Sequence, residues 1–404
     1  MCRKNGRTAS RLAGFDFPTR RDQMAVMRKV DTIVIGGGIA GLSAAARIAR
    51  HGETLVLERE SAPGYHSSGR SATFCHFGIG GGLVHKLTSI GKTAFAVAPE
   101  GDHPPLARRM AALFIGRANE IDKLGALEKT TRAHSPDTRR IEGEALRDIV
   151  PVLKTGSEGF AAGLLDPDAY KLDSDVMLQT NIRALREAGG NLVTDAPVNA
   201  IRRGGEDWIV DTTGASYTAK RIVNAAGSWA DAIAKMAGIT PLGLQPLRRT
   251  IIVIRPPEGI DVSGWPFTKT VSEEGFYMLP EGSGRLLASP QDETPSEPCD
   301  AQPDEETIAL AAWRVEQATD IEIRRVEHKW AGLRTFAPDK NPVAGYAPDA
   351  PGFFWLAGQG GFGLQTSPAM AMAAEALAFG LDWPEELRGA GVTPEMLQPA
   401  RLAL

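Results

Sequence analysis

The chain has 404 residues, of which 43% are hydrophobic and 23% charged, and its formal net charge at pH 7 is −4. The length predicts two domains, and the small negative charge argues against a nucleic-acid-binding protein. The sequence has no run of about 18 or more apolar residues, so we expect no transmembrane segment. The cysteines, Cys2, Cys75 and Cys299, are too scattered for a disulfide framework or a metal site. We therefore expect a cytoplasmic protein without a bound metal.

The beginning of the chain is rich in arginine and lysine, and its acidic residues are Asp16 and Asp22. We interpret residues 1–29 as a flexible basic extension, or as an upstream mis-start with Met24 or Met27 as the true initiator. A transit peptide is the alternative, because such peptides are also rich in arginine and poor in acidic residues. The first interpretation is favoured because the first predicted strand begins soon after Met27.

The stretch from Val30 to Glu58 has the pattern of strand, glycine turn, helix and second strand. Gly36, Gly38 and Gly41 follow the spacing G-x-G-x-x-G, which allows a tight turn, a close approach of backbone to a pyrophosphate, and close packing of helix on strand. The helix N-terminus offers free N–H groups and a positive dipole to phosphates. Glu58 lies about 20 residues after the turn, where an acidic residue binds ribose hydroxyls. The motif predicts a bound dinucleotide.

Residues 59–72 are rich in glycine and serine, which predicts a loop. Its hydroxyl groups, its backbone N–H groups and Arg70 suit a diphosphate or an electron-rich ring. A simple surface loop with a basic residue is the alternative. The position directly after Glu58 favours contact with the cofactor.

The rest of the chain divides into segments of different character. A helix is predicted over residues 175–187 and a hairpin over residues 208–219. Residues 221–230 read as a buried strand that ends in small residues, which let a ligand approach the backbone. Residues 247–289 alternate short strands with proline and glycine turns, which is typical of an antiparallel sheet. A second glycine loop, residues 358–366, precedes the last long helix.

These segments favour a flavin over a nicotinamide. A nicotinamide dehydrogenase would continue from Glu58 with regular β-α units, whereas this chain continues with the hydroxyl-rich loop. The second glycine loop leads into a helix, whose N-terminus would stabilise the negative charge of a reduced flavin. We therefore expect FAD as the cofactor.

The chain resembles the FAD-dependent D-amino-acid oxidase/dehydrogenase family, which includes glycine and sarcosine oxidases. The resemblance is carried by Gly36–Gly41, Gly69–Ala72, Val223–Trp229, Trp330–Arg334 and Gly358–Thr366. Within the family, the chain looks most like the D-arginine dehydrogenases, through Pro241–Pro246, Trp330–Phe336, Val343–Tyr346 and Gln359–Gly361.

We expect an α/β fold with an added antiparallel sheet. A Rossmann-like FAD-binding domain comprises residues 30–90, 152–245 and 331–390, and a smaller α+β substrate-binding domain comprises residues 91–151 and 246–330.

The resemblance implies FAD held without a covalent bond, because no cysteine is well placed to tether it and Cys299 lies in an acidic, proline-rich loop. The expected cofactor-binding residues lie in the glycine turn, the loop after Glu58, the small-residue segment and the second glycine loop. They are Gly36, Gly38, Ile39, Ala40, Gly41, Glu58, Arg59, Ser67, Ser68, Arg70, Ser71, Ala72, Val198, Ala226, Gly227, Trp229, Arg334, Gly360, Gly361, Phe362, Gly363, Leu364, Gln365 and Thr366.

The resemblance also implies how the substrate is held. Arg334 matches the family arginine that binds the amino-acid carboxylate, a task that suits a guanidinium because it forms two parallel hydrogen bonds. Tyr277 matches a tyrosine over the site, and Arg249 a second arginine on the carboxylate side. The alternatives are a buried ion-pair partner for Arg334 and a surface strand residue for Arg249.

The sequence departs from the D-arginine dehydrogenases at the expected substrate site. Phe74 replaces a histidine near the flavin, Ile79 replaces a tyrosine, and Ala111 aligns with the acidic residue that receives the arginine side chain. The loss of a charge-assisted hydrogen bond, about 1.5–3 kcal/mol, argues against a strong preference for D-arginine. His76 either supplies the missing polar contact, as a fourth catalytic candidate, or is an ordinary structural histidine.

The expected reaction is oxidative deamination of a D-amino acid by hydride transfer to flavin N5. It gives an imino acid and then a 2-oxo acid and ammonia, and an unidentified electron acceptor reoxidises the flavin. A glycine- or sarcosine-type amine oxidase and a 2-hydroxy-acid dehydrogenase on the same fold are alternatives. A flavin-binding sensor or structural subunit is a further alternative, against which the combination of Tyr277 and Arg334 argues.

Overall fold

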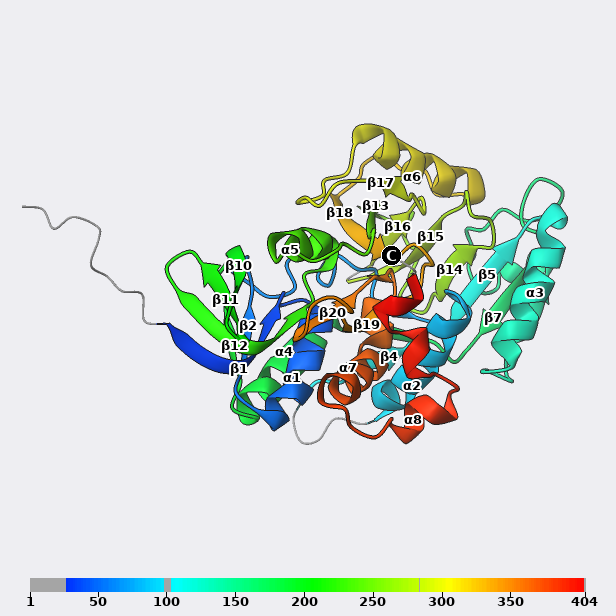
Figure 1. Ribbon diagram of the computed structural model, residues 1–404. Coiled ribbons are helices and arrows are strands. Elements are labelled where there is room, and N and C mark those ends of the chain that lie inside the picture. Colours follow the sequence, from blue (N-terminus) through cyan, green and yellow to red (C-terminus); the bar gives the residue numbers. More distant parts are fainter. Residues whose placement is uncertain (1–26, 98–102, 283, 403–404) are drawn as a thin grey trace, which may run out of the picture.

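The computed structural model describes residues 27–97, 103–282 and 284–402, which form two large sheets and one small sheet (Figure 1). Residues 1–26, most of the expected basic extension, lie outside the described residues. Arg28 and Lys29, which were expected to belong to that extension, instead begin the first strand, β1 (Arg28–Ile35). Their side chains pair there with Glu53 and Asp207.

The first sheet has a parallel centre. Its parallel strands, in order, are β9 (Asn191–Val193), β2 (Thr54–Leu57), β1, β12 (Ser216–Asn224) and β20 (Phe353–Ala357). Three strands are antiparallel to their neighbours: β11 (Asp207–Thr212) beside β12, β10 (Val198–Gly204) beside β11, and β19 (Val343–Tyr346) beside β20. This is the Rossmann-like sheet expected from the sequence.

Both faces of the first sheet are covered, which explains why successive residues at the centre of its strands are apolar. Val34 and Val56 pack in one core, and their chain neighbours Ile33 and Leu55 pack in the other. Helices on the first face are α1 (Ile39–Ile48), α4 (Ser174–Glu187) and α7 (Gly363–Phe379), which Figure 1 shows side by side. The short helix α5 (Ala230–Met236) joins the second core. Helix α2 (Gly82–Ala96) packs on α7 and also contacts α8 (Glu385–Gly389).

The second sheet is mostly antiparallel, as expected for residues 247–289. Its order is β21 (Gln359–Gly360), β18 (His328–Phe336), β13 (Gln245–Ile254), β16 (Arg285–Ser289), β15 (Tyr277–Glu281), β14 (Phe267–Thr270), β5 (Ala112–Gly116), β7 (Ala162–Asp166) and β6 (Arg139–Glu142). The short strand β17 (Thr294–Pro295) also pairs with β13. β7 and β18 lie in this sheet, although the expected boundaries assign β7 and most of β18 to the FAD-binding domain. The division into domains stays a prediction.

The two faces of the second sheet have different neighbours. Ile252, Met278 and Ala288 occupy directly paired positions and pack against α6 (Glu305–Ala318), which covers this face in Figure 1. Because side chains alternate along a strand, the neighbouring positions Ile251 and Tyr277 belong to the opposite face. That opposite face meets the first sheet.

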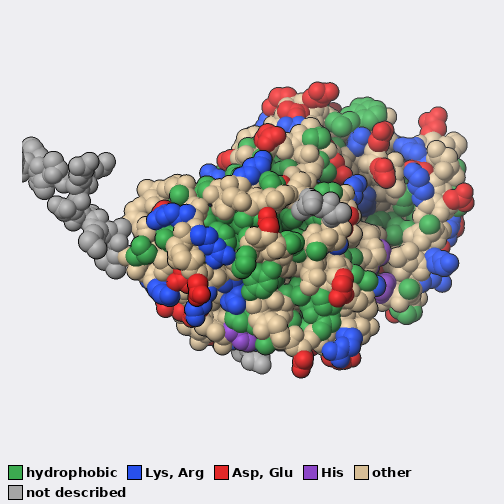
Figure 2. Space-filling view, in the orientation of Figure 1, with side chains coloured by type: hydrophobic (Ala, Val, Ile, Leu, Met, Phe, Trp, Pro, Cys, Tyr) green, Lys and Arg blue, Asp and Glu red, His purple; other side chains and the backbone are tan. Residues whose placement is uncertain are grey.

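The remaining elements lie at the sides of the two large sheets. Helix α3 (Ile121–Arg132) packs on β5 and β7, at the end of the molecule away from β1 (Figure 1). The small sheet contains β3 (Phe74–Cys75), β8 (Tyr170–Leu172) and β4 (Ala107–Arg109). Lys, Arg, Asp and Glu side chains are scattered over the face shown in Figure 2, with hydrophobic side chains between them. Within the described ranges, no helix combines the length and the apolar character that crossing a membrane requires.

Candidate active site

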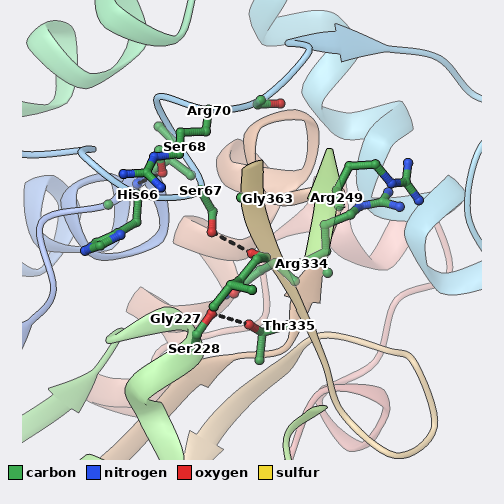
Figure 3. Close-up of a pocket in the computed structure, with 18 of the residues that line it drawn as sticks. His66, Ser67, Ser68, Arg70, Gly227, Ser228, Arg249, Arg334, Thr335 and Gly363 are labelled. Carbon is green, nitrogen blue, oxygen red and sulfur yellow. Dashed lines mark hydrogen bonds between the residues drawn. The ribbon is translucent and has the colours of Figure 1, made fainter. Parts of the chain in front are cut away.

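A cavity of about 950 Å³ lies between the two large sheets. The first sheet contributes the start of α1 and the loop after β2, and the second sheet contributes β13, β14, β15 and β18. The loop before α7 contributes the rest of the wall. Ser228 and Thr335, whose hydroxyl oxygens lie 2.7 Å apart, join the turn after β12 to β18 at this boundary (Figure 3). The cavity is therefore built where the two halves of the fold meet.

The glycine turn after β1 leaves the N-terminus of α1 open to the cavity. Gly36 has a φ of +111°, and a Cβ atom there would lie 2.4 Å from the carbonyl oxygen of Ala225. A Cβ atom at Gly41 would lie 2.0 Å from the carbonyl oxygen of Gly36, so this glycine serves the packing of helix on strand. The N-cap of α1 is Gly38, which supplies no side-chain cap. The Ile39 N–H donates a hydrogen bond of 3.0 Å to Ser68 Oγ, and the next N–H groups in the first turn of α1 are left for a ligand.

Glu58 follows β2 at the edge of the cavity and is 7% exposed. One of its carboxylate oxygens accepts a hydrogen bond from the Gly37 N–H at 2.7 Å, and the other accepts one from the Glu60 N–H at 2.9 Å. A carboxylate has about four acceptor positions, so two remain for the hydroxyl groups of a ligand. Nearby, the Arg59 guanidinium lies 5.0 Å from the centre of the Trp229 ring, and both residues line the cavity.

Arg70, an expected cofactor ligand, has a different main role in the structure. Its guanidinium donates hydrogen bonds to the carbonyl oxygens of Ala301 and Ala331, both at 3.1 Å, and pairs with Asp300. Ser67, in the same loop, donates a hydrogen bond of 2.6 Å to the carbonyl oxygen of Leu333 (Figure 3). The side chain of Arg70 thus holds the loop against the second sheet, because protein groups occupy its donors.

The loop before α7 presents donors to the cavity. Helix α7 has Phe362 as its N-cap and no side-chain cap, so N–H groups of its first turn are available. The Nε2 atom of Gln359 is buried at the cavity wall and has no hydrogen-bond partner in the described part of the chain. A Cβ atom at Gly361 would fall 1.6 Å from the Arg334 guanidinium, so glycine is needed for this arginine to lie against the loop.

Charged and polar side chains gather on one face of the second sheet. Lys269 is paired with Tyr277 across β14 and β15, and Arg249 is paired with Gly332 across β13 and β18. Arg334, two residues after Gly332, points to the same face because side chains alternate along a strand. These four side chains line the cavity together although they come from four different strands (Figure 3 shows the two arginines).

The two arginines converge on one carboxylate. Arg334 Nη1 and Arg249 Nη2 each donate a hydrogen bond of 3.1 Å to the same oxygen, Oε1 of Glu293. Arg249 also lies 3.9 Å from Asp292, and its guanidinium is 6.0 Å from the centre of the Tyr277 ring. Burial, followed by the charge of Arg249, lowers the pKa of Arg334 to about 10. Arg334 thus stays protonated at neutral pH, and the site is built to hold an anion.

Lys269 adds a third cation that the sequence interpretation missed. Burial, then the charges of Arg249 and Arg334, lower its pKa to about 7. Its ammonium group donates hydrogen bonds to the side-chain oxygen of Gln291 and to the carbonyl oxygen of Thr270. The signal in the sequence was a lysine in an otherwise uncharged strand, and the importance of this lysine depends on which face of the sheet it occupies.

The comparison with known families decides the broad identity of the chain. The family described as FAD dependent oxidoreductase (DAO) matches residues 31–377. The chain belongs to this family. FAD is therefore its cofactor, and the cavity between the two sheets is where the fold offers the groups that such a ligand needs.

Relatives of this FAD-dependent oxidoreductase act on different molecules. Glycine oxidase of Geobacillus kaustophilus is 24% identical over 370 residues, which cover 84% of this chain and 90% of that protein. Human mitochondrial dimethylglycine dehydrogenase is 27% identical over 276 residues, or 65% of this chain, and the match spans only 30% of that longer protein.

Solved structures show the same fold. L-α-glycerophosphate oxidase of Mycoplasma pneumoniae, in a structure with FAD bound, has a TM-score of 0.78 and 19% sequence identity, covering 87% of this chain and 95% of that one. The mixed sheets and second domain of this architecture agree with the expected fold class.

The residues of this oxidoreductase fit FAD. The N-terminus of α1 beside the Glu58 carboxylate suits a pyrophosphate and a ribose. Elsewhere along the same cavity, the unpaired Gln359 amide and the first turn of α7 supply further hydrogen-bond donors. Of the expected cofactor-binding residues, all but Gly41 and Thr366 line the cavity. Thr366 is buried in α7, where its hydroxyl donates a hydrogen bond to the Phe362 carbonyl.

His76 is the expected catalytic residue that the structure places elsewhere. It is fully buried and does not line the cavity. Its Nε2 lies 2.8 Å from Asp166, and its Nδ1 accepts a hydrogen bond from the Gly78 N–H. Both ring nitrogens are therefore engaged in the protein interior, and we assign His76 a structural role. The partner that fixes it comes from β7, far along the chain, so no local pattern reveals it.

Of the other three positions at which the sequence departs from the D-arginine dehydrogenases, two lie at the cavity and one does not. Phe74 and Ile79 line the cavity, whereas Ala111 does not, and its carbonyl oxygen instead accepts a hydrogen bond from the Phe267 N–H. Among the described residues, no cysteine lines the cavity: Cys75 is buried and Cys299 is exposed elsewhere. The expected contacts missed Glu293, which lies in a loop without a recognisable motif, and Gln359, which belongs to the second glycine loop but was not named as a contact.

Proposed function

We propose that this FAD-dependent oxidoreductase oxidises the carbon that bears the amino group of an amino acid, and that a D-amino acid is its substrate. The observation that carries the proposal is the convergence of Arg249 and Arg334 on one oxygen of Glu293. Two guanidinium groups positioned for one carboxylate in a large cavity suit the carboxylate of an amino acid. The D configuration rests on the sequence resemblance.

The proposed roles follow from the positions of the side chains. Arg334 and Arg249 bind the substrate carboxylate in place of Glu293, and the Tyr277 hydroxyl adds a hydrogen bond to it. Phe74 and Phe267, whose rings stack at 3.9 Å between centroids, form an apolar wall that excludes water from the reacting carbon. Holding the carboxylate at one end fixes the orientation of the Cα–H bond, which contributes much of the rate.

The cofactor is proposed to bind without a covalent link, a proposal that rests on the sequence resemblance; among the described residues, no cysteine lines the cavity. The start of α1 and Glu58 would hold its diphosphate and ribose, and the loop of residues 360–365 its ring. When bound, FAD accepts the hydride that leaves the substrate carbon. The substrate nitrogen releases a proton, and water hydrolyses the resulting imino acid to a 2-oxo acid and ammonia.

A glycine- or sarcosine-type amine oxidase is the second candidate. The glycine oxidase match, which extends over 84% of this chain, favours it. The arginine pair serves this function equally well, because glycine and sarcosine also carry one carboxylate next to the nitrogen.

The proposal is tested by adding candidate substrates to the purified flavoprotein under anaerobic conditions and recording the loss of visible flavin absorbance. We expect D-amino acids to bleach the flavin and their L enantiomers to leave it oxidised. Bleaching by glycine and sarcosine alone would favour the second candidate. Bleaching by 2-hydroxy acids but by no amine would overturn both, and peroxide formation in air would identify oxygen as the electron acceptor.

A further inference from the structure

Lys269 is a cation that the binding of a single carboxylate does not explain. It lines the cavity on the same face as Arg249 and Arg334, directly across from Tyr277. The two arginines already share one carboxylate oxygen, that of Glu293. An amino acid with one carboxylate would replace Glu293 and leave the ammonium of Lys269 without an anion.

The immediate neighbours of Lys269 are neutral. Its ammonium group donates to the Gln291 side-chain oxygen and to the Thr270 carbonyl oxygen, and within the described ranges no carboxylate lies in ion-pair contact with it. Gln291 is fixed by hydrogen bonds from its own amide to Thr270 Oγ1, at 3.1 Å, and to the Phe276 carbonyl oxygen, at 3.3 Å. The Gln291 oxygen is thereby turned towards the lysine, which is held in place without being neutralised.

The charges around this end of the cavity leave room for a dianion. Arg249 and Arg334 are positive, Lys269 is positive in its protonated form, and Asp292 and Glu293 are the anions next to the arginines. Both oxygens of Asp292 accept hydrogen bonds from Thr250, so this residue stays in place when a ligand binds. When Glu293 moves off the arginines, Arg249 and Arg334 outweigh Asp292 by one positive charge, and the protonated form of Lys269 adds a second. Glu273 and Glu274 also line the cavity, and because both are exposed, solvent screens their charges.

We infer that the preferred substrate carries two carboxylates, the first bound by Arg249 and Arg334 and the second by Lys269. The class comprises acidic amino acids and N-carboxyalkyl amino acids whose second carboxylate reaches β14. Such a substrate, with its amine in the neutral form that reacts, carries two negative charges and matches the excess of the cluster. The inference rests on the proposed function in its use of the arginine pair, and adds Lys269 as the residue that determines specificity.

The test compares acids with their neutral amides of the same size. The holoenzyme is mixed anaerobically with D-glutamate or D-glutamine, and with D-aspartate or D-asparagine, and the rate of flavin bleaching is measured against concentration. We expect an acid to be preferred over its amide by about tenfold or more in kcat/KM, the effect of one charge-assisted hydrogen bond. Equal or better use of both amides would overturn the inference.

Variants of Lys269 separate a role in specificity from a role in folding. Lys269→Met, similar in size and neutral, should lower the preference for acid over amide about tenfold, and Lys269→Arg should restore most of it. Flavin content and the unfolding temperature report whether each variant folds. A binding measurement provides a second readout: succinate should perturb the flavin spectrum at lower concentration than butyrate in the wild type but not in Lys269→Met. An equal loss for acid and amide in Lys269→Met would overturn the inference.

The outcomes for the two proposals differ. If monocarboxylic D-amino acids bleach the flavin and dicarboxylic ones do not, the proposed function stands and the inference about Lys269 fails. If 2-hydroxy dicarboxylic acids bleach the flavin and no amine does, the proposed function fails while the two-carboxylate site stands.

Discussion

The two ends of the cavity are built in different ways. At the first sheet, the groups offered to a phosphate are backbone N–H groups at the start of α1, next to the turn that Gly36 forms, with the Glu58 carboxylate beside them. At the second sheet they are long side chains, Arg249, Lys269 and Arg334, from three separate strands. The first end depends on turns that only glycine can form, and the second on the alternation of side chains across a sheet. Substitutions at the first end should therefore impair cofactor binding, and substitutions at the second end should impair substrate binding.

The largest effect is expected at the backbone end. Gly36→Val places a branched side chain at a φ of +111° and against the Ala225 carbonyl oxygen, so we expect loss of bound FAD or of soluble protein. Flavin content per protein measures this. Gly125→Ala, in α3 and with no atom within 4 Å of the added Cβ, is the control and should keep FAD. Full flavin occupancy in Gly36→Val would show that the turn is not needed for the cofactor.

The next effect is expected at the side-chain end, without loss of the cofactor. Arg334→Ala should keep its FAD but lose about a hundredfold or more in kcat/KM for amino acids, because two charge-assisted hydrogen bonds disappear. Arg334→Lys keeps the charge but not the planar guanidinium, so its kcat/KM should lie between those of the wild type and Arg334→Ala. Rapid-mixing measurements of flavin reduction give the substrate affinity. Unchanged saturation in Arg334→Ala would exclude this arginine as the carboxylate ligand.

A substitution at Glu293 is expected to have a smaller effect and to strengthen substrate binding instead of weakening it. Its carboxylate occupies both arginines, so a substrate has to displace it. Glu293→Gln should tighten the binding of amino acids by up to about tenfold, since the competing partner loses its charge. Glu297→Gln, exposed in the same loop, should leave binding unchanged. Weaker binding in Glu293→Gln would show instead that Glu293 helps to hold the substrate.

The smallest effect is a pH dependence of stability at Lys269. Its pKa is lowered from 10.5 to about 7 by burial and by Arg249 and Arg334, with Glu293 and Glu273 acting in the opposite direction. Between these two values the unfolded chain binds more protons than the folded one, so this group makes the protein more stable as the pH rises from about 7 towards 10. Lys269→Met should remove this rise.

We expect Lys269→Met to be more stable than the wild type at pH 6, on the order of 1 kcal/mol or more, with the difference shrinking at pH 9. Chemical unfolding of the holoprotein at both pH values measures it. A difference that is independent of pH would mean that Lys269 keeps an ordinary pKa in the folded protein.

The sequence predicts the backbone end of the cavity better than the side-chain end, because the first is a local motif and the second is assembled from separate strands. Gly36, Gly38 and Glu58 form a local motif whose geometry follows from a strand, a turn and a helix in succession, and all of them line the cavity. His76 and Lys269 show where prediction from the sequence stops. One was expected at the site and is buried against Asp166, and the other was overlooked and lies on the cavity wall. Neither assignment follows from neighbouring residues.

The sequence by itself determined the nucleotide-binding turn and the antiparallel character of the second sheet, because local spacing and periodicity are enough for these, and its resemblance to known flavoproteins indicated the FAD family. Only the tertiary structure decided which side chains share the substrate end. β13, β14, β15 and β18 bring Arg249, Lys269, Tyr277 and Arg334 to one face through strand register, and a shift of one residue in any strand would turn its side chain to the opposite face. Glu293 lies beside them because its loop returns along β13.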